Sequence, residues 1–181
     1  MNADLEQTLA LLECGPATFN ALLRTLPDAW TLATESDASW SPRYVVGHLV
    51  YCEHGNWLER MEWILEHGES KPFEPLNREG GRERLKTTPL PALLDEFAEV
   101  RANKLAKLRA INLQPADLER KGKHPAFRTV TLGQLLATWA AHDMTHLHQV
   151  SRILAKQYDE AVGPWKQYLG VLHCDGHSVK D

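Results

Sequence analysis

The chain has 181 residues, which suits one globular domain rather than two. Its 24 acidic residues outnumber its 20 lysines and arginines, and a net charge of −4 excludes the basic surface that holds a nucleic-acid backbone. No stretch reaches the roughly 18 apolar residues of a membrane helix, and the N-terminus lacks the basic and apolar regions of a secretory signal. We therefore expect a cytoplasmic protein that binds neither membrane nor nucleic acid.

The N-terminal part of the chain predicts two helical regions. Leucines at three- and four-residue spacing predict a first helix, but Gly15-Pro16 predicts a break in it, or two separate helices, because proline lacks a backbone donor. A second long helix is predicted over residues 42–67. It opens at Ser41-Pro42, a serine N-cap followed by proline at the first helical position, and Gly68 marks its end.

Two more long helices are predicted in the rest of the chain. Residues 71–89 are rich in proline and glycine and form a long loop, and a third helix follows over residues 91–110. The strongest helical period of apolar residues runs over residues 131–158, and a short terminal helix is predicted over 162–172. No segment alternates like a strand, so we expect an all-α four-helix bundle, one domain over residues 1–172.

Cysteines and histidines are the next informative residues. Three cysteines, Cys14, Cys52 and Cys174, are odd in number and far apart, which argues against a disulfide framework and a structural zinc knuckle. Nine histidines are many for this length. Chance alone gives about 0.45 pairs at i, i+4 spacing. The two such pairs in the chain therefore gain meaning only from their context.

The helix over residues 131–158 turns one of these pairs toward the core. On a helical wheel of about 100° per residue, His142 and His146 lie on the same side of the apolar face, and Asp143 lies inside the apolar stripe. His148 projects to solvent. The simpler explanation is two core histidines whose N–H groups Asp143 accepts. The alternative is that both imidazoles bind one metal ion, which needs a third ligand from another helix.

The helix over residues 42–67 offers that third ligand. His48 lies at the edge of its apolar arc, and His54 projects away. Cys52 lies one turn after His48, and three interpretations stay open: a small buried side chain, a neighbour of the metal, or a nucleophile.

Polar residues also interrupt the apolar arc of this second helix. They are Glu53, Asn56 and Arg60. Glu53 and Arg60 could pair with each other or with Asp143, and a buried ion network that fixes helix register is favoured over direct catalysis.

The other aromatic residues and histidines carry weaker signals. Four tryptophans are interpreted as core anchors, Trp40, Trp57, Trp63 and Trp139. Trp165 and Tyr168 line either a pocket or an interface. The second histidine pair, His173 and His177, lies in a polar tail over residues 173–181 and is interpreted as solvated. His67 and His124 have no assigned role.

Several short motifs follow one another along the predicted helices. They are Trp40-Ser41-Pro42-Arg43, then Gly47-His48-Leu49 with Glu53 and Arg60, then Thr131-Leu132-Gly133-Gln134-Leu135-Leu136, and His142-Asp143-Met144-Thr145-His146-Leu147. In this order, over roughly residues 5–170, the chain resembles the DinB-like superfamily of metal-dependent four-helix-bundle proteins. The resemblance implies that His48, His142 and His146 form a three-histidine site for a divalent metal ion such as Zn, Ni or Fe.

The resemblance also implies a range of activities. The family includes S-transferases that use low-molecular-weight thiols such as bacillithiol or mycothiol, and a thiol-dependent isomerase. We therefore expect an enzyme in which the metal activates a thiol or water toward a small-molecule electrophile. The alternative is a non-catalytic metal-containing bundle with a stress-response or ligand-binding role. A homodimer is implied by resemblance alone.

The roles of the remaining site residues follow from this mechanism. Asp143, Glu53 and Arg60 are expected behind the ligands, where they orient the helices and imidazoles. No general base is identified, and no cofactor other than the metal is expected. The loop over residues 71–89 and the C-terminal helix are the expected walls of a substrate pocket.

Overall fold

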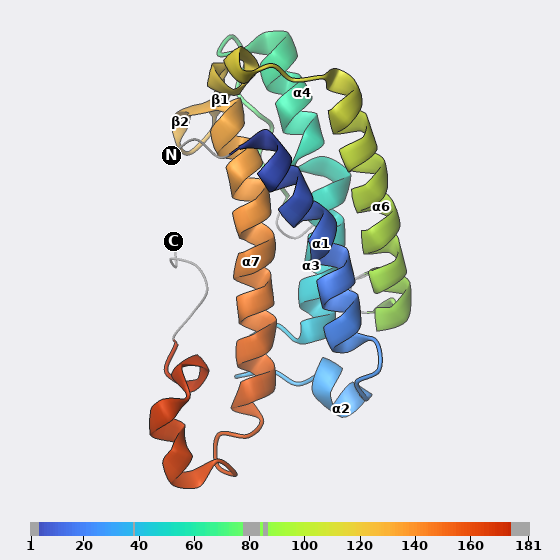
Figure 1. The fold of residues 1–181 in the computed structure, drawn as a ribbon, viewed down its shortest axis with the longest axis vertical. Coiled ribbons are helices and arrows are strands. Elements are labelled where there is room, and N and C mark those ends of the chain that lie inside the picture. The colour runs from blue at the N-terminus through green and yellow to red at the C-terminus, as the bar shows by residue number, and fades with distance from the viewer. Residues whose placement is uncertain (1–3, 38, 78–83, 85–86, 175–181) are drawn as a thin grey trace.

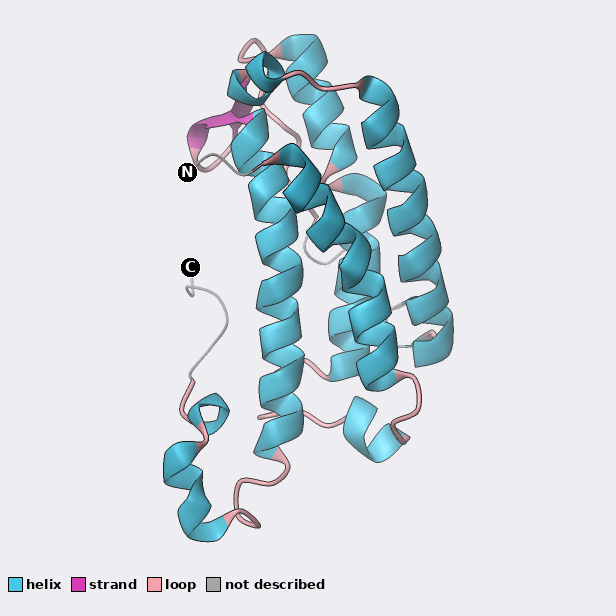
Figure 2. Cartoon of the chain, viewed as in Figure 1, coloured by secondary structure: helices cyan, strands magenta, loops and turns pink. Residues whose placement is uncertain are grey.

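The fold is a bundle of long helices, described by a computed structural model over residues 4–37, 39–77, 84 and 87–174 (Figure 1). Its helices are α1 (Leu5–Leu23), α3 (Pro42–Gly55), α4 (Leu58–His67), α6 (Leu90–Ile111) and α7 (Leu132–Lys156). Helix α4 continues the direction of α3, so these two form one column, which runs parallel to α6 and antiparallel to α1 and α7 (Figures 1 and 2). The predicted four-helix bundle is confirmed. Among the described residues, no helix is long and apolar enough to cross a membrane.

Helix α1 runs without interruption through Pro16, so the predicted break near Gly15-Pro16 is wrong. A proline in a helix leaves the carbonyl four residues earlier without its usual donor. Here that carbonyl belongs to Leu12, and Nη1 of Arg101 in α6 donates to it at 2.7 Å. A hydrogen bond from another helix thus replaces the one that proline removes.

The second predicted helix, over residues 42–67, is divided. Helix α3 begins at the Ser41 N-cap, as predicted, and ends at Gly55. Asn56 and Trp57 turn the chain before α4 begins at Leu58. The apolar period alone did not reveal this turn, because both halves keep their apolar residues toward the core. Gly68 ends α4 with a φ of 55°, as the sequence predicted.

Helices α6 and α7 match the predicted third and fourth helices closely, but the connection between them holds a hairpin. Strands β1 (Lys121–His124) and β2 (Arg128–Thr131) pair antiparallel, with Gly122 opposite Val130. The expectation of no strands was wrong because four-residue, mostly polar strands show no clear alternation. Gly122 allows close packing: a Cβ there would lie 2.6 Å from Cγ1 of Ile64 in α4.

Shorter elements complete the described chain. Helix α2 (Asp28–Thr31) follows α1, and the 3-10 helix η1 (Pro115–Glu119) precedes the hairpin. The predicted terminal helix is instead two 3-10 helices, η2 (Gly163–Tyr168) and η3 (Gly170–Leu172), which lie outside the bundle beside α7 (Figure 1). The predicted loop over 71–89 and tail over 173–181 fall partly outside the described residues.

The apolar core forms two clusters, one toward each end of the bundle. One cluster contains Leu12, Trp57 and Trp139, and the other contains Phe19 and Phe97. Trp57 and Trp139 are buried, as predicted, whereas Trp40 and Trp63 are half-buried. Between the two clusters lies a polar layer to which α1, α3, α6 and α7 all contribute.

Candidate metal centre

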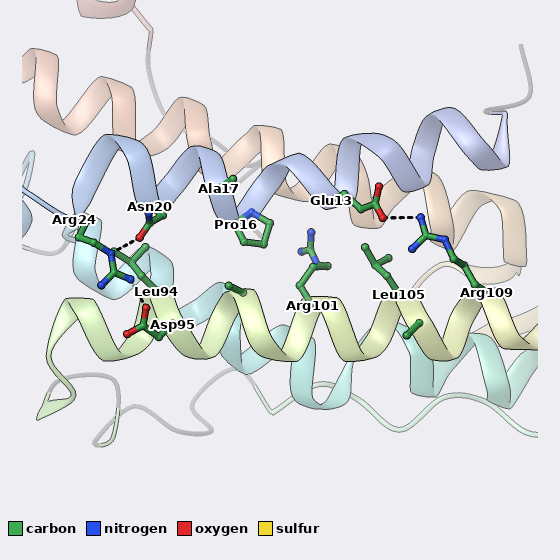
Figure 3. Close-up of a pocket in the computed structure, with 13 residues that line it drawn as sticks. Glu13, Pro16, Ala17, Asn20, Arg24, Leu94, Asp95, Arg101, Leu105 and Arg109 are labelled. Carbon is green, nitrogen blue, oxygen red and sulfur yellow. Dashed lines mark hydrogen bonds and ion pairs between the residues drawn. The ribbon is translucent and has the colours of Figure 1, made fainter.

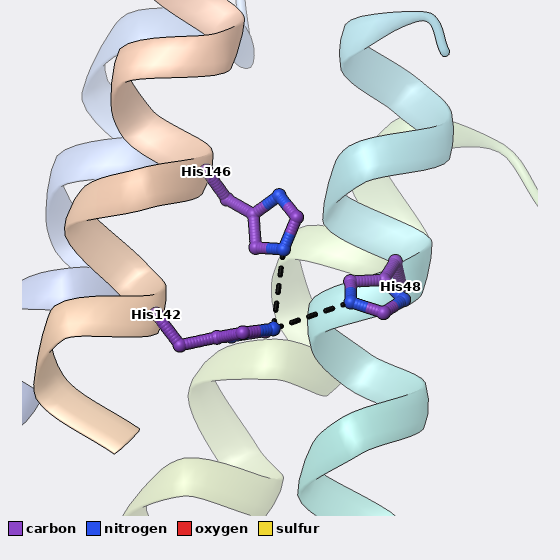
Figure 4. Close-up of side chains that lie close together, drawn as sticks. All are labelled: His48, His142 and His146. Atoms are coloured by element: carbon purple, nitrogen blue, oxygen red, sulfur yellow. Dashed lines mark hydrogen bonds between the residues drawn. The ribbon is translucent and has the colours of Figure 1, made fainter. Parts of the chain in front are cut away.

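Three imidazoles converge on the α3/α7 side of the polar layer (Figure 4). His48 comes from α3, and His142 and His146 come from successive turns of α7. The Nε2 atom of His142 lies 3.3 Å from that of His48 and 3.1 Å from that of His146. One ring nitrogen of each residue lies within 4.8 Å of those of the other two. The structure thus brings together the three histidines that the resemblance indicates.

The spacing of these nitrogens fits a shared metal ion. With metal–nitrogen distances of about 2.0–2.1 Å, two ligands of one tetrahedral or octahedral ion lie about 2.8–3.4 Å apart. The separations of 3.1 and 3.3 Å fall within that range. Asp143, the acceptor required by the core-histidine explanation, directs both carboxylate oxygens to Arg101 instead.

The orientation of His146 is set by a residue that sequence reasoning missed. Its Nδ1 lies 2.8 Å from Oε1 of Gln149, a side chain that is only 3% exposed. An N–H donated from Nδ1 leaves Nε2 with a lone pair, which is the state that a metal ligand requires. Gln149 lies three residues after His146 on the buried face of α7. A polar residue at that position is the feature by which the sequence could have indicated its role.

Aromatic rings and one thiol surround the imidazoles. Trp40 stacks on His146 with an interplanar angle of 10° and lies 4.8 Å from the His48 ring centroid. Trp57 meets the edge of His142 at 5.0 Å. Sγ of Cys52 lies 3.5 Å from Nε2 of His48. Burial, and then the Glu53 carboxylate, raise the pKa of the Cys52 thiol to about 12, which argues against a nucleophile.

A buried ion cluster occupies the other side of the polar layer, and its cation was not predicted. Arg101 of α6 donates two hydrogen bonds to Asp143, at 2.7 and 3.0 Å, and one to Glu53 at 2.7 Å. Nε1 of Trp139 also donates to Glu53. Arg101, Asp143 and Glu53 are each 1% exposed. The predicted ion network exists, but its cation is Arg101 and not Arg60.

Charges inside this cluster depend on one another. Burial raises the pKa of both carboxyl groups, Glu53 and Asp143, and the hydrogen bonds from Arg101 oppose that rise. Burial also disfavours the guanidinium, but its two carboxylate partners outweigh this effect and raise the pKa of Arg101. Arg101 lies in the apolar stripe of α6. A charged residue in such a stripe is the same signal that indicated Asp143 in α7, so the sequence could have indicated Arg101 as well.

Helix α1 contacts this cluster through a glycine. A Cβ on Gly15 would lie 2.6 Å from Oδ2 of Asp143 and 3.3 Å from Nη1 of Arg101. The pair Gly15-Pro16 therefore marks a close approach of α1 to the ion cluster, with Leu12 accepting a hydrogen bond from Arg101 one turn earlier.

Arg60 lies in a different environment. Its guanidinium donates to the backbone oxygen of Glu74 at 3.3 Å and lies over the ring of Phe73. It lines a pocket of about 330 Å³ beside His142. Among the described residues, this pocket is bounded by the hairpin, including Phe127, and not by the expected walls at 71–77 or 162–172.

The remaining histidines are dispersed. His54 and His148 are exposed, as predicted, and His54 pairs with Glu96 at 2.9 Å. His67 packs against Trp63, and His124 stacks on Phe127. His173 is exposed, and His177 lies outside the described residues.

A second, larger groove is separate from the imidazoles. It has a volume of about 500 Å³ and lies between α1 and α6 (Figure 3). Pro16 and Ala17 line one wall, and the ion pair between Glu13 and Arg109 lies at one end. No histidine is among the described residues that line it.

Comparison with solved structures shows the same fold. YfiT from Bacillus subtilis, a four-helix-bundle protein, matches with a TM-score of 0.72 and 22% identity over 84% of this chain and 86% of that one. The mycothiol-dependent maleylpyruvate isomerase matches with a TM-score of 0.59 and 15% identity over 92% of this chain and 72% of that one. The four-helix-bundle protein TT2238 matches with a TM-score of 0.50 and 25% identity, covering 81% of this chain and 97% of that one.

Sequence comparison identifies the family. No curated protein matches the chain. The sequence profile of the DinB superfamily matches residues 11–150, which include α3, α6 and the histidines of α7. The chain therefore belongs to the DinB superfamily.

Proposed function

We propose that this protein is a metal-dependent enzyme whose site activates a thiol or a water molecule toward a small electrophile. The observation that carries the proposal is the convergence of three Nε2 atoms, from His48, His142 and His146, at separations of 3.1 and 3.3 Å. YfiT is described as a probable metal-dependent hydrolase, and the isomerase as mycothiol-dependent. These descriptions support both a hydrolase and a thiol-transfer reaction.

Three imidazole ligands suit a catalytic rather than a closed structural site, because such a site keeps an open position. A divalent ion held there would lower the pKa of a bound water or thiol. Gln149 holds His146 with its Nε2 lone pair toward the centre. Trp40 packs on His146, and Trp57 packs against the edge of His142.

Glu53 and Asp143 act in this proposal as positioning residues. Both accept hydrogen bonds from Arg101, so they join α3, α6 and α7 at the level of the imidazoles. Asp143 directly follows His142 in α7, and Glu53 lies five residues after His48 in α3. The ion cluster therefore fixes the separation of the two helices that supply the ligands.

Metal analysis of tag-free protein tests the site. We expect about one divalent ion per chain in the wild type, a loss in His146→Ala, and no change in His148→Ala, the exposed histidine on the same helix. Protein that neither carries nor takes up a divalent metal would contradict the proposal.

An activity assay tests the chemistry. We expect metallated protein to consume electrophiles with a low-molecular-weight thiol, or to hydrolyse them, and His146→Ala to be inactive. Persistent inactivity of fully metallated protein across a panel of thiols and electrophiles would favour a non-catalytic, ligand-binding bundle.

A further inference from the structure

The pocket beside His142 has the composition of a small-molecule site. Its volume is about 330 Å³, and it lies between the α3/α4 turn, the first turns of α7 and the hairpin. Trp57, Phe127, Val130 and Leu135 supply an apolar wall. Among the described residues, none that lines it is acidic. Ligand pockets commonly combine such walls with a few polar groups that fix orientation.

Arg60 is the positive group of this pocket. It is half-buried, and within the described part of the chain no carboxylate pairs with it. Burial lowers the pKa of Arg60, as expected for a cation that has lost water without gaining a counter-ion. By contrast, Arg101 meets two carboxylates, and Arg152 meets Glu35 at 2.6 Å. Arg60 therefore retains the capacity to bind an anion.

Asn56 supplies a second, independent indication. The residue is 6% exposed and lines the pocket, and its buried Oδ1 has no hydrogen-bond partner among the described residues. Leaving a buried acceptor unsatisfied is costly, so such atoms commonly have a partner from a ligand or water. The oxygen can accept a hydrogen bond from a hydroxyl, amine or thiol group of a ligand once the side chain turns it toward the pocket.

We propose that this pocket binds a small organic carboxylate with an apolar body and a hydrogen-bond donor. Arg60 binds the carboxylate, Asn56 accepts the hydrogen bond, and the apolar wall with Trp57 and Phe127 covers the body. His142 lines the same pocket, so the ligand lies next to the three imidazoles. The inference rests on the proposed function only in naming this ligand as the electrophilic substrate, since recognition by Arg60 and Asn56 needs no metal.

Binding measurements test the recognition of the carboxylate. The probes are 2-hydroxy-3-phenylpropanoate, its uncharged amide, and 3-phenylpropanoate, which lacks the hydroxyl, each titrated calorimetrically into metal-free wild-type protein. We expect the hydroxy acid to bind best. Arg60→Gln should weaken it about 10- to 100-fold, the effect of losing a charge-assisted hydrogen bond, and abolish the preference over the amide.

Matched variants separate this effect from a general loss of charge or fold. Arg109→Gln removes an exposed arginine of the α1/α6 groove and should leave binding unchanged. Arg60→Lys keeps the charge without the guanidinium fork and should retain part of the affinity. Asn56→Leu should weaken the hydroxy acid more than 3-phenylpropanoate. Circular dichroism checks that each variant is folded.

A histidine variant distinguishes failure of this inference from failure of the proposed function. If His146→Ala abolishes carboxylate binding and Arg60→Gln does not, the carboxylate binds at the histidines and the inference is overturned. Equal binding of acid and amide by the wild type also overturns it. Arg60-dependent selectivity in a protein that takes up no metal would sustain the pocket and refute the metal-dependent enzyme.

Discussion

Two polar clusters lie in the middle of the bundle, and they differ in what their members offer one another. Around Arg101, a guanidinium meets two carboxylates and a backbone carbonyl, so donors face acceptors. Around His142, three nitrogens of the same kind face one another. A buried group of opposite charges holds helices together, whereas a group of like ligands leaves room for an ion. Burial alone therefore does not separate a structural cluster from a chemical one.

The largest expected effect comes from removing the cation of the ion cluster. Arg101→Leu leaves Asp143 and Glu53 buried without a counter-ion, and we expect it to cost about 3–5 kcal/mol of unfolding free energy. Urea denaturation followed by circular dichroism measures the loss. Arg109→Leu breaks an exposed ion pair on the same helix and should cost no more than about 1 kcal/mol. Similar losses in the two variants would show that the cluster is not structural.

A smaller loss is expected where α1 meets the same cluster. Gly15→Ala places a methyl group against Oδ2 of Asp143, and overpacking of this kind costs about 1–3 kcal/mol. Gly55→Ala is the matched control, because a Cβ there would have no heavy atom of the described chain within 4 Å beyond its own helix backbone and its two neighbours. The control should be neutral or stabilise by up to about 1 kcal/mol. A stable Gly15→Ala protein would argue against this close contact.

The histidine cluster is tested through the residue that orients it. Gln149→Leu removes the acceptor at Nδ1 of His146 and should weaken metal binding about 10- to 100-fold. Competition with a chelator measures the affinity. Gln149→Glu keeps an acceptor and should retain binding, and an unchanged affinity in the leucine variant would mean that Gln149 does not orient the ligand.

The smallest effect concerns the thiol beside His48. Because burial raises the pKa of Cys52 to about 12, its thiolate fraction at pH 8 is of the order of 10⁻⁴. Iodoacetamide at pH 8 should therefore modify Cys14 and Cys174, which are exposed, but not Cys52 in the native protein. Mass spectrometry of native and urea-unfolded samples gives the counts. Rapid labelling of native Cys52 would indicate that this side of the bundle opens readily.

Much of the bundle could be predicted because its signals are local. The apolar period and the capping pair Thr131 and Gln134 determine where α7 begins, and Ser41-Pro42 does the same for α3. The inward direction of His142 and His146 follows from the same period. Their convergence with His48 depends on how two helices pack together. The resemblance to a family predicted this convergence, whereas a helical-wheel projection describes each helix by itself.

The missed features depend on contacts between distant segments. Arg101 lies 42 residues from Asp143 and 48 from Glu53, so no local pattern pairs them. Local sequence rules predict that Gly15-Pro16 interrupts a helix. They do not include the hydrogen bond that Arg101 donates to the carbonyl of Leu12. The hairpin depends on packing against Ile64 rather than on its own polar sequence.

Proline in α1 has a consequence for how the protein folds. The carbonyl of Leu12 obtains its donor only when Arg101 arrives from α6, so an isolated α1 segment lacks one hydrogen bond in the middle of its ladder. Completion of this helix is thereby linked to docking of a segment 89 residues away. Such a link makes secondary and tertiary structure form together, and it favours cooperative, all-or-none assembly of α1 with α6.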